Sequence, residues 1–144
     1  MKFIVSRVED WDVVAKAIAE QLKPGMAVRL TGPLGAGKTT LVQALAKVLG
    51  AKSVPRSPTF SLMRTYQVGK RIGIKRLIHV DAYRLESASD AHALGLDEEL
   101  VGGDTVLAVE WAEKLGNLLN AIPSISVQIE TDPGDGVRRV STAP

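Results

Sequence analysis

A glycine-rich segment that ends in a lysine and two threonines is the part of the sequence best suited to chemistry. Residues 32–39 match the pattern G-x-x-x-x-G-K-[ST]. Glycines let the backbone turn sharply, so that successive amides can point at phosphate oxygens beside the start of a helix. Lys38 would add a mobile positive charge for the β- and γ-phosphates, and Thr39 a hydroxyl ligand for Mg²⁺. The pattern therefore predicts binding of ATP with Mg²⁺ by Gly32, Pro33, Leu34, Gly35, Ala36, Gly37, Lys38, Thr39 and Thr40.

Two acidic residues stand where a magnesium nucleotide site needs them. Asp81 follows the expected strand 77–80, which is apolar except for His79, and Glu110 follows the mostly apolar expected strand 105–109. Each acid would therefore leave a strand at its carboxyl end, where sheets of this kind bind ligands. One acid could hold the metal and the other could orient the attacking water, but the spacing does not decide between them.

Four further side chains close to these positions could take part. Thr59 could offer a hydroxyl to the γ-phosphate or to Mg²⁺ from a nucleotide-sensitive loop, or it could simply begin a strand. Arg84 could neutralise charge in the transition state, or it could be a surface arginine. We expect His79 to be a packed or supporting histidine, and Trp111 to be a core residue.

These residues need a scaffold, and the sequence predicts an α/β fold. Short apolar runs alternate with amphipathic stretches, which is typical of a mostly parallel central sheet flanked by helices. Asp10 is placed to cap the first helix. The expected strands are 3–5, 27–30, 59–66, 76–80 and 105–109. The expected helices are 10–22, 39–49, 85–100, which is broken around Gly95, and 112–119. A C-terminal hairpin is expected from 125–130 and 137–141.

Composition sets outer limits on the function. With 144 residues and 45% hydrophobic content, the chain can bury one core, so we expect a single P-loop domain over residues 1–144. The absence of cysteine excludes a disulfide framework and a thiolate metal site. A net charge of +2 without a basic block gives little support to nucleic-acid binding, and no apolar run is long enough to span a membrane. We therefore expect a cytoplasmic protein with no membrane or DNA partner.

Four short segments occur in a specific order. They read G-P-L-G-A-G-K-T-T at 32–40, S-P-T-F-S-L at 57–62, H-V-D-A-Y-R-L at 79–85 and V-E-W-A-E at 109–113. Their order, spacing and the chain length resemble the bacterial tRNA threonylcarbamoyladenosine biosynthesis ATPase family TsaE. The resemblance implies that Lys38 and Thr39 contact phosphate and Mg²⁺, that Glu110 is a metal ligand and that Asp81 serves hydrolysis. It also implies that Thr59 lies in a switch-like catalytic loop.

The same resemblance implies partners and further contacts. Members of the family use ATP in a complex with TsaD and TsaB that installs threonylcarbamoyl on adenosine 37 of tRNAs reading codons that begin with A, so tRNA is met indirectly. Terminal segments close the nucleotide site in the family, which makes Asp10 and Arg139 candidates for adenine contacts. Pro33 departs from the acidic residue usual at its position and removes one backbone donor, while the amides of residues 35–39 remain.

Three alternative functions are compatible with the same motifs. A P-loop small-molecule kinase would need an arginine-rich lid, for which residues 70–76 are the only basic cluster. A nucleotide-dependent binding module would use ATP to order a surface, with hydrolysis incidental. Direct tRNA binding has little support, because no recognisable RNA-binding motif is present.

Overall fold

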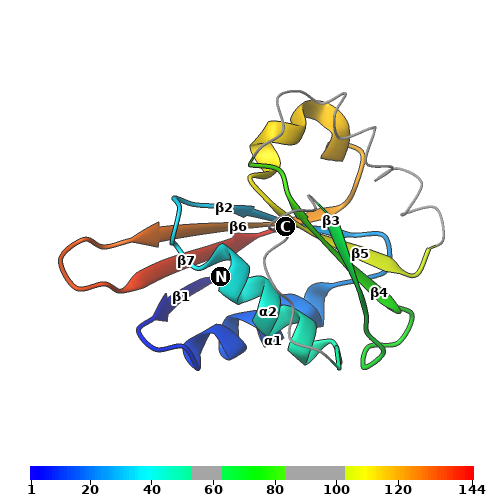
Figure 1. The fold of residues 1–144 in the computed structure, drawn as a ribbon, viewed down its shortest axis with the longest axis horizontal. Helices are drawn as coiled ribbons and strands as arrows, with labels where there is room; N and C mark the ends of the chain where they lie inside the picture. The colour runs from blue at the N-terminus through cyan, green and yellow to red at the C-terminus, as the bar shows by residue number, and fades with distance from the viewer. Residues whose placement is uncertain (53–62, 84–102) are drawn as a thin grey trace.

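Seven strands form one sheet in the computed structural model, which describes residues 1–52, 63–83 and 103–144. The strand order is β1-β7-β6-β2-β5-β4-β3 (Figure 1). The elements are β1 Lys2–Val5, α1 Asp10–Gln21, β2 Ala27–Thr31, α2 Lys38–Val48, β3 Met63–Gln67, β4 Arg76–Asp81, β5 Thr105–Glu110, the 3₁₀ helix η1 Ala112–Leu119, β6 Ser124–Thr131 and β7 Arg138–Ala143.

The centre of the sheet is parallel and its flanks are antiparallel. Strands β6, β2, β5 and β4 pair in parallel, while β7 pairs antiparallel with both β6 and β1, and β3 pairs antiparallel with β4. The α/β class, the parallel centre and the C-terminal β6–β7 hairpin are thus confirmed. The pairing of β1 with β7, which joins the first and last strands of the chain, was not predicted.

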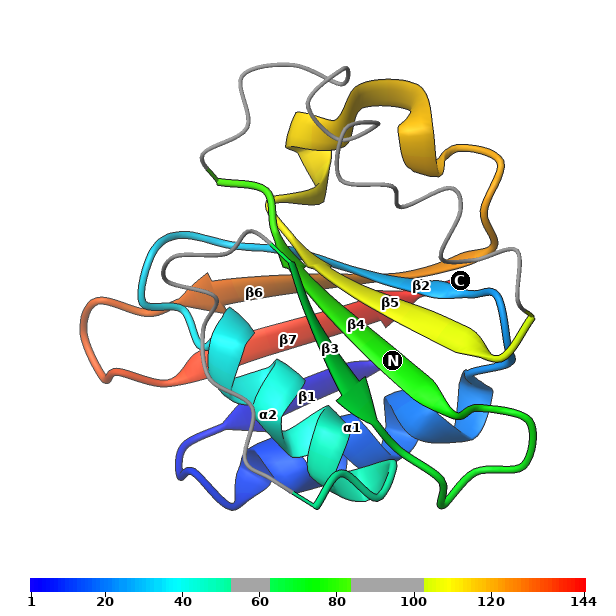
Figure 2. The same cartoon turned by 45° about the vertical axis from the view of Figure 1, so that its right-hand side comes forward.

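Layers of different composition cover the two faces of the sheet. Helices α1 and α2 lie together on one face, and η1 lies over the other (Figure 2). All six residues of β5 are buried, as expected for a central strand covered on both sides. Leu107 and Val109 of β5 pack towards η1, and Val106 and Ala108 pack towards α1 and α2. His79 of β4 pairs with Ala108, so its side chain lies on the face of the sheet that α1 and α2 cover.

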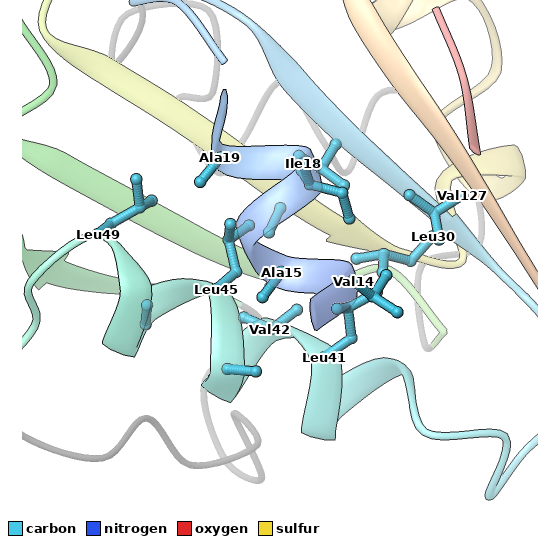
Figure 3. Close-up of a cluster of buried hydrophobic side chains, with 14 of the residues drawn as sticks. Val14, Ala15, Ile18, Ala19, Leu30, Leu41, Val42, Leu45, Leu49 and Val127 are labelled. Atoms are coloured by element: carbon cyan, nitrogen blue, oxygen red, sulfur yellow. The ribbon is translucent and has the colours of Figure 1, made fainter. Parts of the chain in front are cut away.

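Helices α1 and α2 meet through apolar side chains spaced three and four residues apart. Figure 3 shows these side chains interleaved between the two helices and the sheet. The cluster contains Val14, Ala15, Ile18, Ala19, Leu30, Leu41, Val42, Leu45, Leu49 and Val127. This packing holds the first turn of α2, which carries Lys38 and Thr39, against the carboxyl end of β2.

Most predicted elements occur within a residue or two of their expected bounds, with one local correction. Asp10 does not cap α1, because its carboxylate accepts hydrogen bonds from the amides of Ser6 and Arg7, each at 2.9 Å, and Glu9 occupies the N-cap position. The predicted helix 85–100 and the first part of the predicted strand 59–66 lie outside the described residues. Within the described ranges, no helix combines the length and apolarity needed to cross a bilayer.

Candidate functional site

The carboxyl ends of three neighbouring strands bring the predicted site residues together. Leu30 of β2 is in register with Glu110 of β5, and Glu110 is in register with Asp81 of β4. The glycine-rich loop leaves β2 at this same edge of the sheet and enters α2. A cavity of about 290 Å³ opens there, lined by Leu34, Gly35, Gly37, Lys38, Thr39, Thr40, Asp81, Tyr83, Glu110 and Trp111.

Two glycines of the loop are required by close packing as well as by backbone conformation. Gly37 has φ +109° and Gly32 has φ +155°, values that side chains disfavour. A Cβ atom on Gly37 would overlap the Trp11 ring, and one on Gly32 would lie 2.8 Å from the carbonyl oxygen of Ile129. The loop is therefore seated on α1 and β6. Trp11 is a buried residue in the first turn of α1, and its contact with the loop was not predicted from the sequence.

Lys38 is held at the mouth of the loop, with only 4% of its surface exposed. Its Nζ donates hydrogen bonds to the carbonyl oxygens of Gly32 at 2.5 Å and Pro33 at 2.8 Å. Burial lowers the pKa of Lys38, and the carboxylates of Glu110, Glu113 and Asp81 act in the opposite direction. The nearby carboxylates therefore favour the protonated, positively charged form of Lys38. A bound phosphate would favour that form in the same way.

Glu110 lies between a hydroxyl and a histidine. Thr39 Oγ1 donates to both carboxylate oxygens of Glu110 at 3.0 Å, and His79 Nε2 lies 2.5 Å from Glu110 Oε2. The donation from Thr39 leaves the lone pairs of its hydroxyl oxygen available to a cation. Hydroxyl and carboxylate oxygens are the donors that Mg²⁺ prefers, so the residues present fit the predicted metal. The expected supporting role of His79 is consistent with this contact.

Trp111 packs against the core on the η1 side, as expected, and it also lines the cavity of the site. It is half-buried, and it has a left-handed backbone conformation with φ 58° and ψ 46°. Its ring centroid is 4.4 Å from Lys38 Nζ, within the range of a cation–π contact, and 5.1 Å from the ring of Tyr83. The turn at Trp111 places the ring beneath the lysine, and the side-chain type alone gave no indication of that turn.

The two predicted adenine contacts are not among the residues that line this cavity. The Asp10 carboxylate accepts from two backbone amides, which lower its pKa, and exposed Arg139 pairs with Asp132 at 3.5 Å. Arg138 contacts the loop instead, donating to Ala36 O at 3.3 Å and Gly35 O at 3.2 Å. The assignments of Asp10 and Arg139 stay predictions. The position of Arg138 two residues before the apolar Val140, on the same strand face, was the signal that could have identified it.

Replacing Arg138 with alanine should weaken nucleotide binding about five- to tenfold, because two loop carbonyls would lose a charged donor that fixes their direction. The exposed Lys47→Ala variant, in the last turn of α2 at the end remote from the loop, removes an equal charge and is the control. Titration of both variants with a fluorescent ATP analogue measures the difference. Equal losses in the two variants would contradict a role for Arg138 and favour a general charge effect.

Two other candidates, Thr59 and Arg84, lie outside the described residues, so their roles stay predictions. Within the described residues, no cluster of three or more histidine, cysteine or acidic side chains forms a ready metal site. A Mg²⁺ ion at this edge would therefore take much of its coordination from phosphate and water, as Mg²⁺ commonly does in nucleotide sites.

Comparison with known proteins gives one consistent result. The model of the family described as threonylcarbamoyl adenosine biosynthesis protein TsaE matches residues 5–140. A Mycobacterium leprae tRNA threonylcarbamoyladenosine biosynthesis protein TsaE is 38% identical over 122 residues, covering 82% of this chain and 75% of that protein. Its Aquifex aeolicus counterpart is 41% identical over 113 residues, covering 77% and 76%. A crystal structure of Bacillus subtilis YdiB matches with a TM-score of 0.71 and 32% identity, covering 99% of this chain and 84% of that one.

Proposed function

Because this chain belongs to the TsaE family of threonylcarbamoyl adenosine biosynthesis proteins, with its P-loop NTPase-like fold, we propose that it binds ATP with Mg²⁺ and hydrolyses it. The hydrolysis would serve an assembly with TsaD and TsaB that modifies adenosine 37 of tRNAs reading codons that begin with A. The protein would meet tRNA indirectly, through that assembly, and would act in the cytoplasm. It would power or reset the complex without making the modification itself.

The observation that carries this proposal is the convergence of Lys38, Thr39, Glu110 and Asp81 on one cavity at the edge of the sheet. Lys38 and the loop amides would bind the phosphates and stabilise charge as water attacks the γ-phosphate in line. Mg²⁺, held by Thr39 and Glu110, would neutralise charge on the phosphate oxygens. Asp81 Oδ1 accepts from the Tyr83 amide at 3.0 Å, which orients the carboxylate that would position the water.

The basic segment that a kinase would need as a lid lies far from this cavity. Residues 68–75 join β3 to β4 at the amino end of β4, whereas the glycine-rich loop lies at the carboxyl ends of the parallel strands. Arg71 is bound there to the end of α1, donating to Glu20 O at 2.8 Å and Leu22 O at 3.0 Å. This placement gives no support to a lid, so hydrolysis remains the preferred activity.

Phosphate release from ATP by the purified protein, alone and with TsaD and TsaB, tests the proposal. We expect TsaD and TsaB together to increase release without any small-molecule acceptor. A rate that the partners leave unchanged, together with faster transfer of phosphate to a nucleoside or metabolite than to water, would contradict the proposal and support the kinase.

A further inference from the structure

One fully buried histidine contacts the site from the strand that carries Asp81. His79 has 0% of its surface exposed, and its neighbours Ile78 and Val80 on β4 are equally buried and apolar. His79 lies two residues before Asp81, so the two side chains leave the same face of β4. A histidine in such a position costs desolvation that an apolar residue would avoid, unless a specific hydrogen bond compensates.

Glu110 is that hydrogen-bond partner. His79 Nε2 lies 2.5 Å from Glu110 Oε2, and Glu110 is itself only 4% exposed. A carboxylate so deeply buried needs donors, and within the described residues it has two, the ring of His79 and the hydroxyl of Thr39. Among the residues that the structure describes, His79 Nδ1 has no hydrogen-bond partner, whereas Nε2 faces the Glu110 carboxylate, so the tautomer that carries its proton on Nε2 suits this contact.

We propose that His79 is a positioning residue whose Nε2–H holds the Glu110 carboxylate in the orientation that accepts the Thr39 proton and faces Mg²⁺. Glu110 of β5 contacts both His79 of β4 and Thr39 in the first turn of α2, so these contacts join three elements. They also tie the strand that carries Asp81 to the strand that carries Glu110. This inference rests on the proposed function, because it assigns His79 a part in the same metal-nucleotide site.

The test compares how strongly Mg²⁺ increases nucleotide affinity in variants at position 79. Affinity for a fluorescent ATP analogue is measured with Mg²⁺ and with EDTA, and thermal unfolding is recorded for each protein. His79→Leu should lose about 10- to 100-fold of the Mg²⁺-dependent gain while its affinity in EDTA stays within about twofold of wild type. His79→Gln keeps a terminal N–H donor at a similar reach, so it should retain a larger part of the gain.

A variant on the other face of the same strand controls for destabilisation. Ile78→Ala opens a cavity in the η1-side core and should lower the unfolding temperature without changing the Mg²⁺-dependent gain. The inference is overturned if His79→Leu keeps the full Mg²⁺-dependent gain in nucleotide affinity. It is also overturned if Ile78→Ala loses as much of that gain as His79→Leu, because His79 then contributes only to packing. A wild-type protein that binds nucleotide equally well with and without Mg²⁺ would instead overturn the proposed metal site, and this inference with it.

Discussion

Replacing Lys38 with alanine is expected to lower phosphate release from ATP about 100- to 1000-fold, with or without TsaD and TsaB. The substitution removes the full positive charge at the mouth of the loop. It also removes the two hydrogen bonds that tie the side chain to Gly32 and Pro33. Both losses act on the same segment, so nucleotide affinity should fall together with turnover. Phosphate release at saturating ATP and titration with a fluorescent ATP analogue measure the two effects separately.

The matched control for Lys38 lies on the same helix. Lys47 is exposed in the last turn of α2, far from the loop, and Lys47→Ala removes an equal charge. We expect that variant to keep wild-type affinity and turnover. Lys38→Ala should also fold normally, because removing a buried ammonium group relieves a desolvation penalty. Unchanged hydrolysis by a folded Lys38→Ala protein would be incompatible with a phosphate-binding role for the glycine-rich loop.

The parts of the site that follow local rules could be predicted from the sequence. The glycine-rich loop is recognisable because its chemistry needs particular residue types at fixed spacing. Asp81 and Glu110 could be placed because each ends an apolar run, and parallel strands present their carboxyl ends at one edge. The same patterns located α1, α2 and the C-terminal hairpin to within a residue or two.

The parts that depend on long-range packing or on an unusual backbone angle could not be predicted. Trp11 reaches Gly37 only because α1 and α2 pack together, and Arg138 reaches the loop only because β7 lies beside β6. Trp111 comes under Lys38 through a left-handed turn that a tryptophan rarely adopts. The strand register that brings His79 to Glu110 is likewise set by the whole sheet. Sequence patterns report little of this, because each contact joins residues far apart in the chain.

Substituting the two acids separately should divide metal binding from hydrolysis. Glu110→Gln is expected to lose about 10- to 100-fold of the Mg²⁺-dependent gain in nucleotide affinity. An amide carries no negative charge and has only one acceptor oxygen, so it is a weaker ligand for Mg²⁺ and cannot accept from Thr39 at both ends as the carboxylate does. Asp81→Asn should keep nucleotide affinity and Mg²⁺ response within about twofold while phosphate release falls about 100-fold or more, because the water loses its orienting carboxylate.

The Asp81→Asn and Glu110→Gln variants also distinguish the proposed ATPase from a nucleotide-dependent binding module. Asp81 is half-buried with one oxygen held by the Tyr83 amide, so Asp81→Asn preserves the shape of the cavity and the donor–acceptor pattern at that oxygen. If cells carrying Asp81→Asn lose the tRNA modification, turnover itself is needed. If they keep it while the purified variant hydrolyses no ATP, nucleotide binding alone orders the functional surface. A reversal of the two phenotypes, with Asp81→Asn losing the Mg²⁺ response and Glu110→Gln keeping it, would exchange the roles assigned to the two acids.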